Sequence, residues 1–470
     1  MEIIGRINEK NILLDALLST QSEMIAVYGR RRVGKTFLIE SVFADKICFS
    51  ISGIHKGSMK DQLNEFSKVL FPKKKERQLI ANWFDAFNLL ETYVEAIKGK
   101  QKKVIFIDEL PWLDTPKSKF IAAFEHFWNT WASKRTDIIL VICGSAASWM
   151  IKKILNSKGG LHNRVTIKIR LLPFNLDETE QYLKTKNIRL NRYDLCQLYM
   201  SIGGIPFYLK QIRRGESVIQ NIERICFTKD GLLYSEFNNL YSALFNNAAK
   251  HIAIINALAN SPQGLNRNIL IKKSKLESGG GISNVLNELL ESGFITEIPA
   301  QSTIVKNNIY RLTDEYSLFY LKFIQQNKFA GEGAWVSLSK TQSYTAWCGY
   351  AFENICFKHT NAIKKALGIA AVYTNIYSWH NSKAQIDMLL DREDRCINIC
   401  EIKYYKSEFE ITKNYEVKLR AKMEAYQSDT KTNKNLFFTF ITSRGLKENM
   451  YKTSLVENSI TLDDLFDKEM

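Results

Sequence analysis

The sequence predicts an α/β protein that opens with a parallel β-sheet and closes with a second, smaller α/β domain. The first observation is an apolar segment, residues 24–28, that ends in a glycine-rich loop and continues into an amphipathic helix. The second is a run of four apolar residues, 104–107, that ends in Asp108 and Glu109. Strands that are apolar throughout are typical of parallel sheets buried on both faces. The third is a β-hairpin pattern at residues 385–403, where acidic residues and a lysine stand among apolar ones.

The glycine-rich loop has the spacing G-x-x-x-x-G-K-T at residues 29–36, which is the Walker A signature. Gly29 and Gly34 let the backbone turn closely around a phosphate, to which the loop amides and the helix N-terminus present donors. We expect Lys35 to reach the β- and γ-phosphates of ATP and Thr36 to bind Mg²⁺. A glycine-containing turn that matches by chance is disfavoured, because a strand and a helix flank the loop as the motif requires. The nucleotide-binding residues predicted from this motif are Gly29, Arg30, Arg31, Arg32, Val33, Gly34, Lys35, Thr36 and Phe37.

Asp108 and Glu109 stand at the carboxyl end of their strand, which is where ligands bind in open α/β sheets. We expect Asp108 to hold Mg²⁺, usually through water, and Glu109 to polarise the attacking water as a general base. The alternative is an acidic turn after a core strand. The Walker A motif about seventy residues upstream disfavours it.

Two further residues are candidates for the phosphate site. The strand predicted at residues 137–143 delivers Ser145 beside the acidic pair, where a hydroxyl can contact the γ-phosphate or the attacking water. A serine that caps a helix beginning at Ala146 is a nearly equal interpretation. Arg164 precedes a fifth strand and can stabilise charge on the transferring phosphoryl group, within one chain or across a subunit interface. A surface arginine without that role is the alternative, and both interpretations stay open.

Length and composition limit the classes of protein. The chain has 470 residues, which is enough for about two to four domains. Its formal charge of +16, from 65 Lys and Arg against 49 Asp and Glu, favours a polyanionic partner such as DNA. The eight cysteines show no C-x-x-C pair, which favours reduced thiols in the cytoplasm. The longest apolar run, residues 138–143, is too short to span a bilayer, so no membrane partner is expected.

Residues 246–325 predict three helices followed by a β-hairpin, which is the order of a winged helix. The third helix, at residues 282–290, would be the recognition helix. The polar residues expected to meet duplex DNA are Ser283, Asn284 and Asn287, with Lys272, Lys273 and Lys275 nearby. Packing of this module against the rest of the protein or against a protein partner is the alternative, because arginine is scarce on that surface.

The last part of the chain carries a set of residues typical of metal-assisted phosphodiester hydrolysis. A helix around residues 347–357 bears Glu353, and the hairpin bears Asp387 on its first strand and Glu401 and Lys403 on its second. Side chains alternate along a strand, so Glu401 and Lys403 point to the same side. We expect Asp387 and Glu401 to bind Mg²⁺ and Lys403 to position or activate the attacking water, with Glu353 completing the set. An exposed cross-strand charge pattern is the alternative. A basic helix suited to contact with a phosphate backbone follows, with Lys413, Lys418, Arg420 and Lys422.

The N-terminal motifs together resemble those of a known family. The Walker A loop, the acidic pair, the strand before Ser145 and the G-G-x-P-x-Y-L turn at residues 203–209 are similar to the archaeal-type P-loop ATPases on the AAA+/STAND side of the P-loop NTPases. The resemblance implies that Gly204 and Pro206 lie in a helical lid and couple its position to the nucleotide state. It also implies an N-terminal element that covers the adenine, formed by Gly5, Arg6 and Glu9.

The C-terminal residues resemble the PD-(D/E)XK pattern of the restriction-endonuclease-like fold, which is similarly found at the C-terminus of archaeal-type ATPases. Ile386 stands where the motif has proline, a variation that leaves the metal ligands intact. The complete prediction is a P-loop NTPase parallel sheet at residues 1–175, a helical lid at 176–245, a winged helix at 246–325 and a restriction-endonuclease-like α/β domain at 340–470.

Two functions are compatible with this organisation. The leading hypothesis is a cytoplasmic ATPase whose nucleotide state controls a DNA-binding and Mg²⁺-dependent DNA-cleaving module. The opposing hypothesis is a STAND-like switch or scaffold that binds ATP, recognises a protein partner and carries an inactive nuclease fold. The intact set Glu353, Asp387, Glu401 and Lys403 favours the first. A homo-oligomer is compatible with both.

Overall fold

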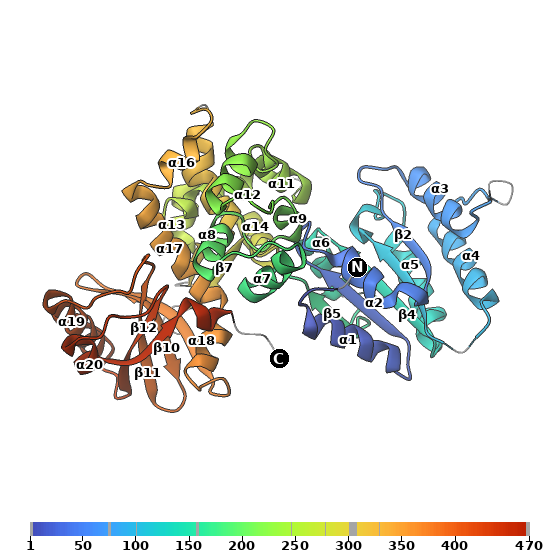
Figure 1. Ribbon diagram of the computed structural model, residues 1–470. Helices are drawn as coiled ribbons and strands as arrows, with labels where there is room; N and C mark the ends of the chain where they lie inside the picture. Colours follow the sequence, from blue (N-terminus) through green and yellow to red (C-terminus); the bar gives the residue numbers. More distant parts are fainter. Residues whose placement is uncertain are drawn as a thin grey trace. The chain divides into compact units, whose positions relative to one another are not determined.

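The computed structural model of the protein divides into two compact units, which are described separately (Figure 1). Unit 1 contains Met1–Pro173 and Asn287–Gly293, and unit 2 contains Phe174–Leu286 and Phe294–Met470. The residues that the structure describes are 3–73, 77–99, 101–156, 159–245, 247–277, 279–299, 308–328 and 330–466. The polar loop expected inside the middle hairpin, at residues 300–307, lies outside the described residues. Within the described ranges, each helix is too short or too polar to span a bilayer.

Unit 1 is built on a parallel five-stranded sheet with the order β2-β3-β4-β1-β5. The strands are β1 (Glu23–Tyr28), β2 (Ile47–Ser52), β3 (Lys103–Asp108), β4 (Ile138–Gly144) and β5 (Ile167–Arg170). All five predicted strands are therefore present, and β4 pairs with both β1 and β3. The apolar runs of β1, β3 and β4 are buried nearly throughout, as expected for central strands of a parallel sheet covered on both faces. The predicted parallel α/β fold is confirmed for this unit.

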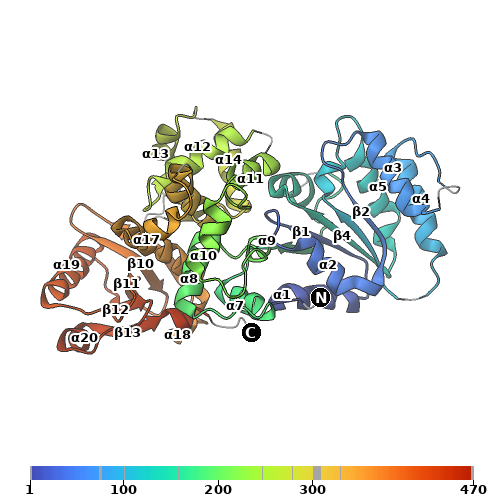
Figure 2. The same cartoon turned by 45° about the horizontal axis from the view of Figure 1, so that its top comes forward.

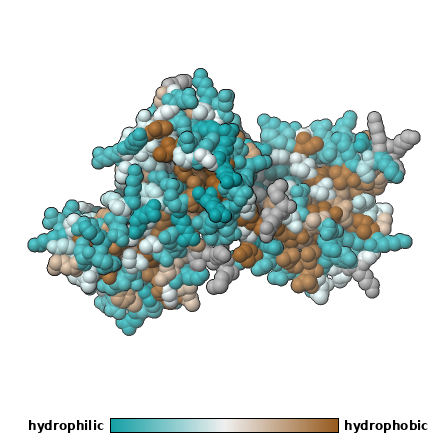
Figure 3. Space-filling model, viewed as in Figure 1, coloured by the Kyte–Doolittle hydropathy of each residue, from teal (hydrophilic) through white to brown (hydrophobic). Residues whose placement is uncertain are grey.

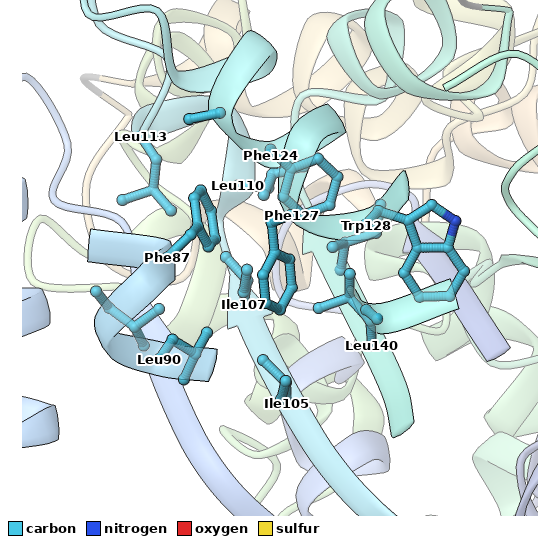
Figure 4. Packing of buried hydrophobic residues seen from close by; sticks show 14 of the residues in the cluster. Phe87, Leu90, Ile105, Ile107, Leu110, Leu113, Phe124, Phe127, Trp128 and Leu140 are labelled. Carbon is cyan, nitrogen blue, oxygen red and sulfur yellow. The ribbon is translucent and has the colours of Figure 1, made fainter. Parts of the chain in front are cut away.

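An aromatic layer holds β3 and β4 in place (Figure 4). Ile105, Ile107 and Leu140 point from these strands into the layer. Phe87 and Phe127 stack above them with ring centroids 4.9 Å apart. The helices of this layer are α3 (Met59–Leu70), α4 (Trp83–Ala96) and α5 (Phe120–Thr130). Because strands and helices interlock here, the carboxyl ends of β3 and β4 are fixed in relation to each other.

The remaining helices of unit 1 include a pair that pack on each other, α1 (Ile7–Leu18) and α2 (Lys35–Phe43). After β4 come the short α6 (Ala147–Trp149) and a π-helix at Met150–Leu155. Apolar residues gather on unit 1 in the view of Figure 3, and those that α1 exposes are Ile7, Ile12, Leu14 and Leu18. These side chains are left outward because α1 is apolar on more than the side that packs inward.

Unit 2 begins with the helices of the predicted lid, α7 (Leu176–Thr185), α8 (Arg192–Ile202), α9 (Pro206–Leu209), α10 (Val218–Ile222) and α11 (Glu236–Leu244) (Figure 2). The G-G-x-P turn joins α8 to α9. A Cβ on Gly204 would lie 1.9 Å from the carbonyl oxygen of Phe174, whose N–H donates to Gly204 O at 2.8 Å. Only glycine lets two backbone segments approach so closely, so the structure gives Gly204 a packing role. Pro206 is the first residue of α9, a position where a missing N–H leaves no hydrogen bond unmade.

The middle of the chain, which lies in unit 2 except for residues 287–293 of unit 1, contains the helices and the hairpin predicted there. The elements are α12 (Ala248–Ala259), β6 (Leu265–Asn266), α13 (Arg267–Ser274), α14 (Gly280–Glu291), β7 (Ile295–Ile298) and β8 (Ile309–Leu312). The three strands form an antiparallel sheet with the order β6-β8-β7, so β8 is its central strand. We call residues 248–312 the middle module. Its assignment as a winged helix stays a prediction.

The last part of unit 2 is a mixed five-stranded sheet with the order β13-β12-β11-β10-β9. The strands are β9 (Thr374–His380), β10 (Gln385–Arg392), β11 (Cys396–Lys403), β12 (Asn435–Thr442) and β13 (Val456–Thr461). β10 and β11 form the predicted antiparallel hairpin, whereas β12 and β13 continue the sheet in parallel from β11. The helices are α15 (Glu315–Phe319), α16 (Ala334–Leu338), α17 (Gln342–Lys358), α18 (Thr360–Ala366), α19 (Lys413–Thr430) and α20 (Met450–Leu455). We call residues 342–466 the C-terminal domain.

Candidate functional sites

The loop between β1 and α2 has the backbone that the Walker A motif requires, but its two glycines are needed for different reasons. Gly29 has φ 144°, and a Cβ there would lie 2.2 Å from the carbonyl oxygen of Leu171. Gly34 has open space around it, while its φ of 94° is in the left-handed region that favours glycine. The sequence predicted that a Cβ would clash with phosphate. The structure shows that at Gly29 it would clash with the segment after β5.

Lys35 is buried, and its ammonium donates to the carbonyl oxygens of Gly29 and Arg30 at 3.0 Å each. The positive charge is therefore held within the turn of the loop, close to the backbone amides that would meet a phosphate. Of the other predicted nucleotide-binding residues, Val33 is buried and Phe37 is 40% exposed.

Thr36 and Asp108 bring the two nucleotide-site motifs together. The Thr36 hydroxyl donates to Asp108 Oδ2 at 2.7 Å, and Asp108 Oδ1 accepts the N–H of Glu109 at 2.9 Å. Hydroxyl and carboxylate oxygens are the donors that Mg²⁺ takes, usually one or two from the protein with water and substrate phosphates completing the shell. The residue pair therefore fits the predicted magnesium site.

Glu109 is held by Ser145. Glu109 Oε2 accepts the Ser145 hydroxyl at 2.8 Å and the Ser145 N–H at 3.0 Å. The backbone of Glu109 itself has φ 46° and ψ 46°, a left-handed conformation that is uncommon outside glycine. The hypothesis that Ser145 caps the following helix is wrong, because α6 has Ala146 at its N-cap and no side-chain cap bond. The hydroxyl instead fixes the orientation of the predicted general base.

The remaining predicted residues of unit 1 are placed as follows. Arg31 lies over the ring of Trp112 with its guanidinium carbon 5.9 Å from the centroid, and Arg30 is buried. Arg164 is exposed in the turn before β5, and its role in phosphoryl transfer stays a prediction. Arg6 donates to Leu172 O at 2.5 Å.

The C-terminal domain contains a cavity of about 880 Å³ at the end of its hairpin. Side chains from α17, β10, β11 and α19 line it, and all four residues predicted from the sequence are among them: Glu353, Asp387, Glu401 and Lys403. Its rim also carries Lys383, Lys418 and Lys422. The predicted constellation therefore shares a single cavity.

Lys403 joins the two hairpin carboxylates. Its ammonium donates to Glu401 Oε1 at 2.7 Å and lies 4.0 Å from Asp387 Oδ2, so Glu401 and Lys403 are on one side of β11 as strand alternation predicted. Asp387 Oδ2 also accepts the N–H of Ile402 at 3.0 Å. Burial and the nearby Glu401 carboxylate raise the pKa of Asp387. Two acidic groups thus share one partly buried lysine.

Glu401 has two further partners that the sequence did not reveal. Lys422 donates to Glu401 Oε2 at 2.7 Å, and the Tyr415 hydroxyl donates to Glu401 Oε1. Burial opposes ionisation of Glu401, but Lys403 and Lys422 outweigh it and hold its pKa below the usual value. Tyr415 and Lys422 are seven residues apart on α19, a spacing that puts them on one helix face. That spacing was the signal available in the sequence, where Lys422 was assigned only to phosphate contact.

Glu353 is paired with Arg311, which the sequence analysis did not single out. Arg311 Nη2 lies 3.3 Å from Glu353 Oε2; the Arg311 side chain is buried and that of Glu353 is partly buried. Burial, followed by the charge of Asp387, raises the pKa of Glu353 to about 7, although Arg311 acts in the opposite direction. Arg311 comes from β8 of the middle module, far away in the sequence.

The two hairpin carboxylates fit the number of protein ligands that Mg²⁺ commonly takes beside substrate phosphates. Within the described ranges, no group of three or more histidine, cysteine, aspartate or glutamate side chains is arranged to hold a metal ion. A cation at Glu401 would replace ammonium donors that now contact both carboxylate oxygens.

Comparison with known proteins agrees with the geometry of unit 1. Residues 4–212 match the family model of an ATPase domain predominantly from Archaea. This part of the chain is therefore similar to an archaeal-type ATPase domain. An uncharacterized protein of Methanocaldococcus jannaschii is 24% identical over 410 residues, which cover 85% of this chain and 87% of that protein. The second similarity therefore extends well beyond the ATPase domain.

Two solved structures are similar to the chain at low identity. The Walker-type ATPase PABY2304 of Pyrococcus abyssi has a TM-score of 0.52 at 15% identity, covering 68% of this chain and 96% of that chain. The ORC2 protein of Aeropyrum pernix, in ADPNP–ADP complexes, has a TM-score of 0.40 at 14% identity, covering 69% of this chain and 93% of that chain. Identities this low concern the fold alone, and the first likeness agrees with a P-loop NTPase fold.

Proposed function

We propose that the ATPase domain binds and hydrolyses ATP and that its nucleotide state controls a DNA-cleaving site in the C-terminal domain. The observation that carries the first half is the 2.7 Å hydrogen bond between Thr36 and Asp108. When bound with ATP, Mg²⁺ supplies positive charge against the phosphates. Lys35 would exchange its loop carbonyls for phosphate oxygens, and Glu109 would accept the proton of the attacking water.

The second half is supported by the convergence of Asp387, Glu401 and Lys403 in one cavity. When bound, Mg²⁺ supplies polarisation of the scissile phosphate. Asp387 and Glu401 would hold the ion, and Lys403 would orient the attacking water. A cavity of about 880 Å³ is within the range that accommodates a small ligand, so a nucleotide unit of DNA fits.

Control of the C-terminal site by the lid is supported by direct contacts inside unit 2. Tyr193 of α8 stacks on Tyr404 with ring centroids 4.9 Å apart, and the Tyr404 hydroxyl donates to Tyr193 O at 3.2 Å. Tyr404 directly follows Lys403 in the sequence. A second contact involves α7: the buried His359 of the C-terminal domain accepts the N–H of Leu176, the first residue of that helix. A displacement of the lid helices would therefore pull on the strand that bears Glu401 and Lys403.

We further propose that the middle module is a winged helix that contacts duplex DNA. Its predicted reading residues Asn284 and Asn287 are exposed. Ser283 is half-buried and accepts a hydrogen bond from Arg267, so it is less available than predicted. Exposed basic residues on the module and on α19 suit a phosphate backbone: Lys272, Lys273, Lys275, Lys413, Lys418 and Arg420. The charge of +16 supports the same partner. A homo-oligomer and a cytoplasmic location remain predictions.

A specific observation favours the opposing function, a STAND-like switch that binds a protein partner and carries an inactive nuclease fold. Both oxygens of Glu401 accept from lysine ammonium groups, so this carboxylate is already neutralised. Such pairing is the arrangement expected of a structural ion-pair network.

A plasmid-nicking assay separates the two functions. Supercoiled DNA is incubated with Mg²⁺, with and without ATP, and the wild type is compared with Asp387→Ala and Lys35→Ala. The matched controls are Asp394→Ala, an acidic residue of the same hairpin, and Lys60→Ala, an exposed lysine of unit 1. The proposal expects that Asp387→Ala abolishes nicking. It also expects that nicking by Lys35→Ala no longer responds to ATP. If Asp387→Ala still nicks DNA, the nuclease assignment is wrong. If the protein retains ATP tightly without hydrolysing it, the STAND-like switch is favoured.

A further inference from the structure

The three carboxylates of the C-terminal cavity face three closely placed cations. Lys403 and Lys422 each lie 2.7 Å from Glu401, and Lys403 also neighbours Asp387. Arg311 lies 3.3 Å from Glu353. The charges within these ion pairs therefore balance, while Lys383 and Lys418 also line the cavity. One of the three ion-paired cations, Arg311, is supplied by a different part of unit 2.

Arg311 is built into this position. It lies on β8, the central strand of the middle module's sheet, and its side chain is 4% exposed. Its guanidinium carbon lies 5.1 Å from the ring centroid of Phe357, one helical turn beyond Glu353 on α17. Within the described part of the chain, Arg311 Nε has no hydrogen-bond partner although it is buried. A buried guanidinium with an unsatisfied nitrogen is expensive, so its presence needs an explanation beyond packing.

Other contacts dock the middle module at the same place. The amide of Gln263 donates to Gln385 Oε1 at 2.6 Å, two residues before Asp387. The amide of Asn354, the neighbour of Glu353, donates to the carbonyl oxygen of Leu312 at 3.3 Å. Arg311 lines a small cavity together with Glu353, Gln385 and Asp387. The docked face of the module therefore meets Glu353 and Asp387 at this small cavity.

We propose that Arg311 is a positioning residue through which the middle module neutralises Glu353 in the C-terminal site, and that withdrawal of β8 opens the site to a divalent cation. This inference rests on the proposed nuclease function and deepens it by naming its regulation. With Arg311 in place, the charges of the three carboxylates are matched by their ion-pair partners. With Arg311 withdrawn, the cavity carries one positive charge less, so its affinity for a divalent cation increases. A ligand that binds the middle module better in its undocked form would load the site.

The experiment measures Mn²⁺ binding to the nucleotide-free full chain, by the loss of the electron paramagnetic resonance signal of free Mn²⁺. Arg311→Met removes the charge, Arg311→Lys retains it, and Arg267→Met is a control that removes the same charge elsewhere in the module. We expect Arg311→Met to bind Mn²⁺ about tenfold more tightly than the wild type, because it removes one positive charge from the neighbourhood of the carboxylates. Arg311→Lys and Arg267→Met should resemble the wild type.

A second variant guards against misfolding. Arg311→Met combined with Glu353→Gln leaves a neutral pair of similar shape, and the gain in Mn²⁺ affinity should disappear. Unchanged or weaker Mn²⁺ binding by Arg311→Met overturns the inference, because Arg311 then supports cation binding or is irrelevant to it. If neither wild type nor Arg311→Met shows Mn²⁺ binding that Asp387→Ala removes, the proposed nuclease function fails, and the inference fails with it.

Discussion

The strongest prediction concerns His359, which should make unit 2 sensitive to mild acid. The imidazole is buried and fixed in one tautomer: Nδ1 donates to Ile355 O at 2.8 Å, so Nε2 accepts the N–H of Leu176 at 3.1 Å. If Nε2 were protonated, its N–H would point at the N–H of Leu176, and the hydrogen bond between them would be lost. Burial accordingly lowers the pKa of His359 to about 4, from an ordinary value of 6.5.

The magnitude follows from the difference between these pKa values. A histidine whose folded pKa is lowered contributes stability above its unfolded pKa and loses it as the pH falls, because the unfolded chain then binds the proton more readily. The full effect below pH 4 is about 3 kcal/mol. Between pH 7.5 and pH 5.0, His359 alone should remove about 2 kcal/mol from the free energy of unfolding.

Hydrogen–deuterium exchange of α7 and α17 at pH 7.5 and pH 5.0, corrected for the intrinsic exchange rate, measures this free energy locally. His359→Gln keeps an acceptor for the Leu176 N–H but cannot titrate. Between pH 7.5 and pH 5.0, its protection against exchange should therefore fall by about 2 kcal/mol less than that of the wild type. His126→Gln, at an exposed position, should behave as the wild type does. Equal pH dependence in the wild type and His359→Gln would refute the reasoning.

Three further predictions concern the two motifs and the contact between lid and site. Lys35→Ala should lower ATP turnover at least about a hundredfold, measured by phosphate release. Gly204→Ala should destabilise unit 2 by about 2 kcal/mol or more in urea, because its Cβ would lie 1.9 Å from Phe174 O; Gly349→Ala, in a helix with open space, should instead stabilise slightly. Tyr193→Ala should keep DNA nicking but remove its response to ATP, and an unchanged response would exclude this contact as the route.

The parts of the structure that follow from local pattern were predictable. The strand before the Walker A loop and the strand before Asp108 are recognisable because a central parallel strand must be apolar along its whole length. The placement of Lys403 beside Glu401 follows from the period of a strand. Ser145 was placed correctly beside the acidic pair, but its partner could not be chosen, because a hydroxyl at a strand end can bond a phosphate, a backbone amide or a carboxylate.

The parts that depend on distant packing were not predictable. Arg311 lies 42 residues before Glu353, in a different module, and nothing in its neighbourhood of apolar strand residues marks it as the partner of a carboxylate. The reason for Gly29 was likewise hidden, because the atom it must avoid belongs to Leu171. Contacts of this kind depend on how the elements pack against each other. A single sequence has no periodic pattern from which such packing can be predicted.

One passage of the chain from unit 1 to unit 2 lies at Pro173 and Phe174. Leu171 belongs to unit 1, where its N–H donates to Tyr28 O, and Leu172 O accepts from Arg6. Phe174 belongs to unit 2, where its N–H donates to Gly204 O and its carbonyl oxygen accepts the hydroxyl of Tyr199. Only Pro173 stands between these hydrogen-bonded residues, and its ring fixes one of its two torsions. The backbone at this passage therefore has little torsional freedom.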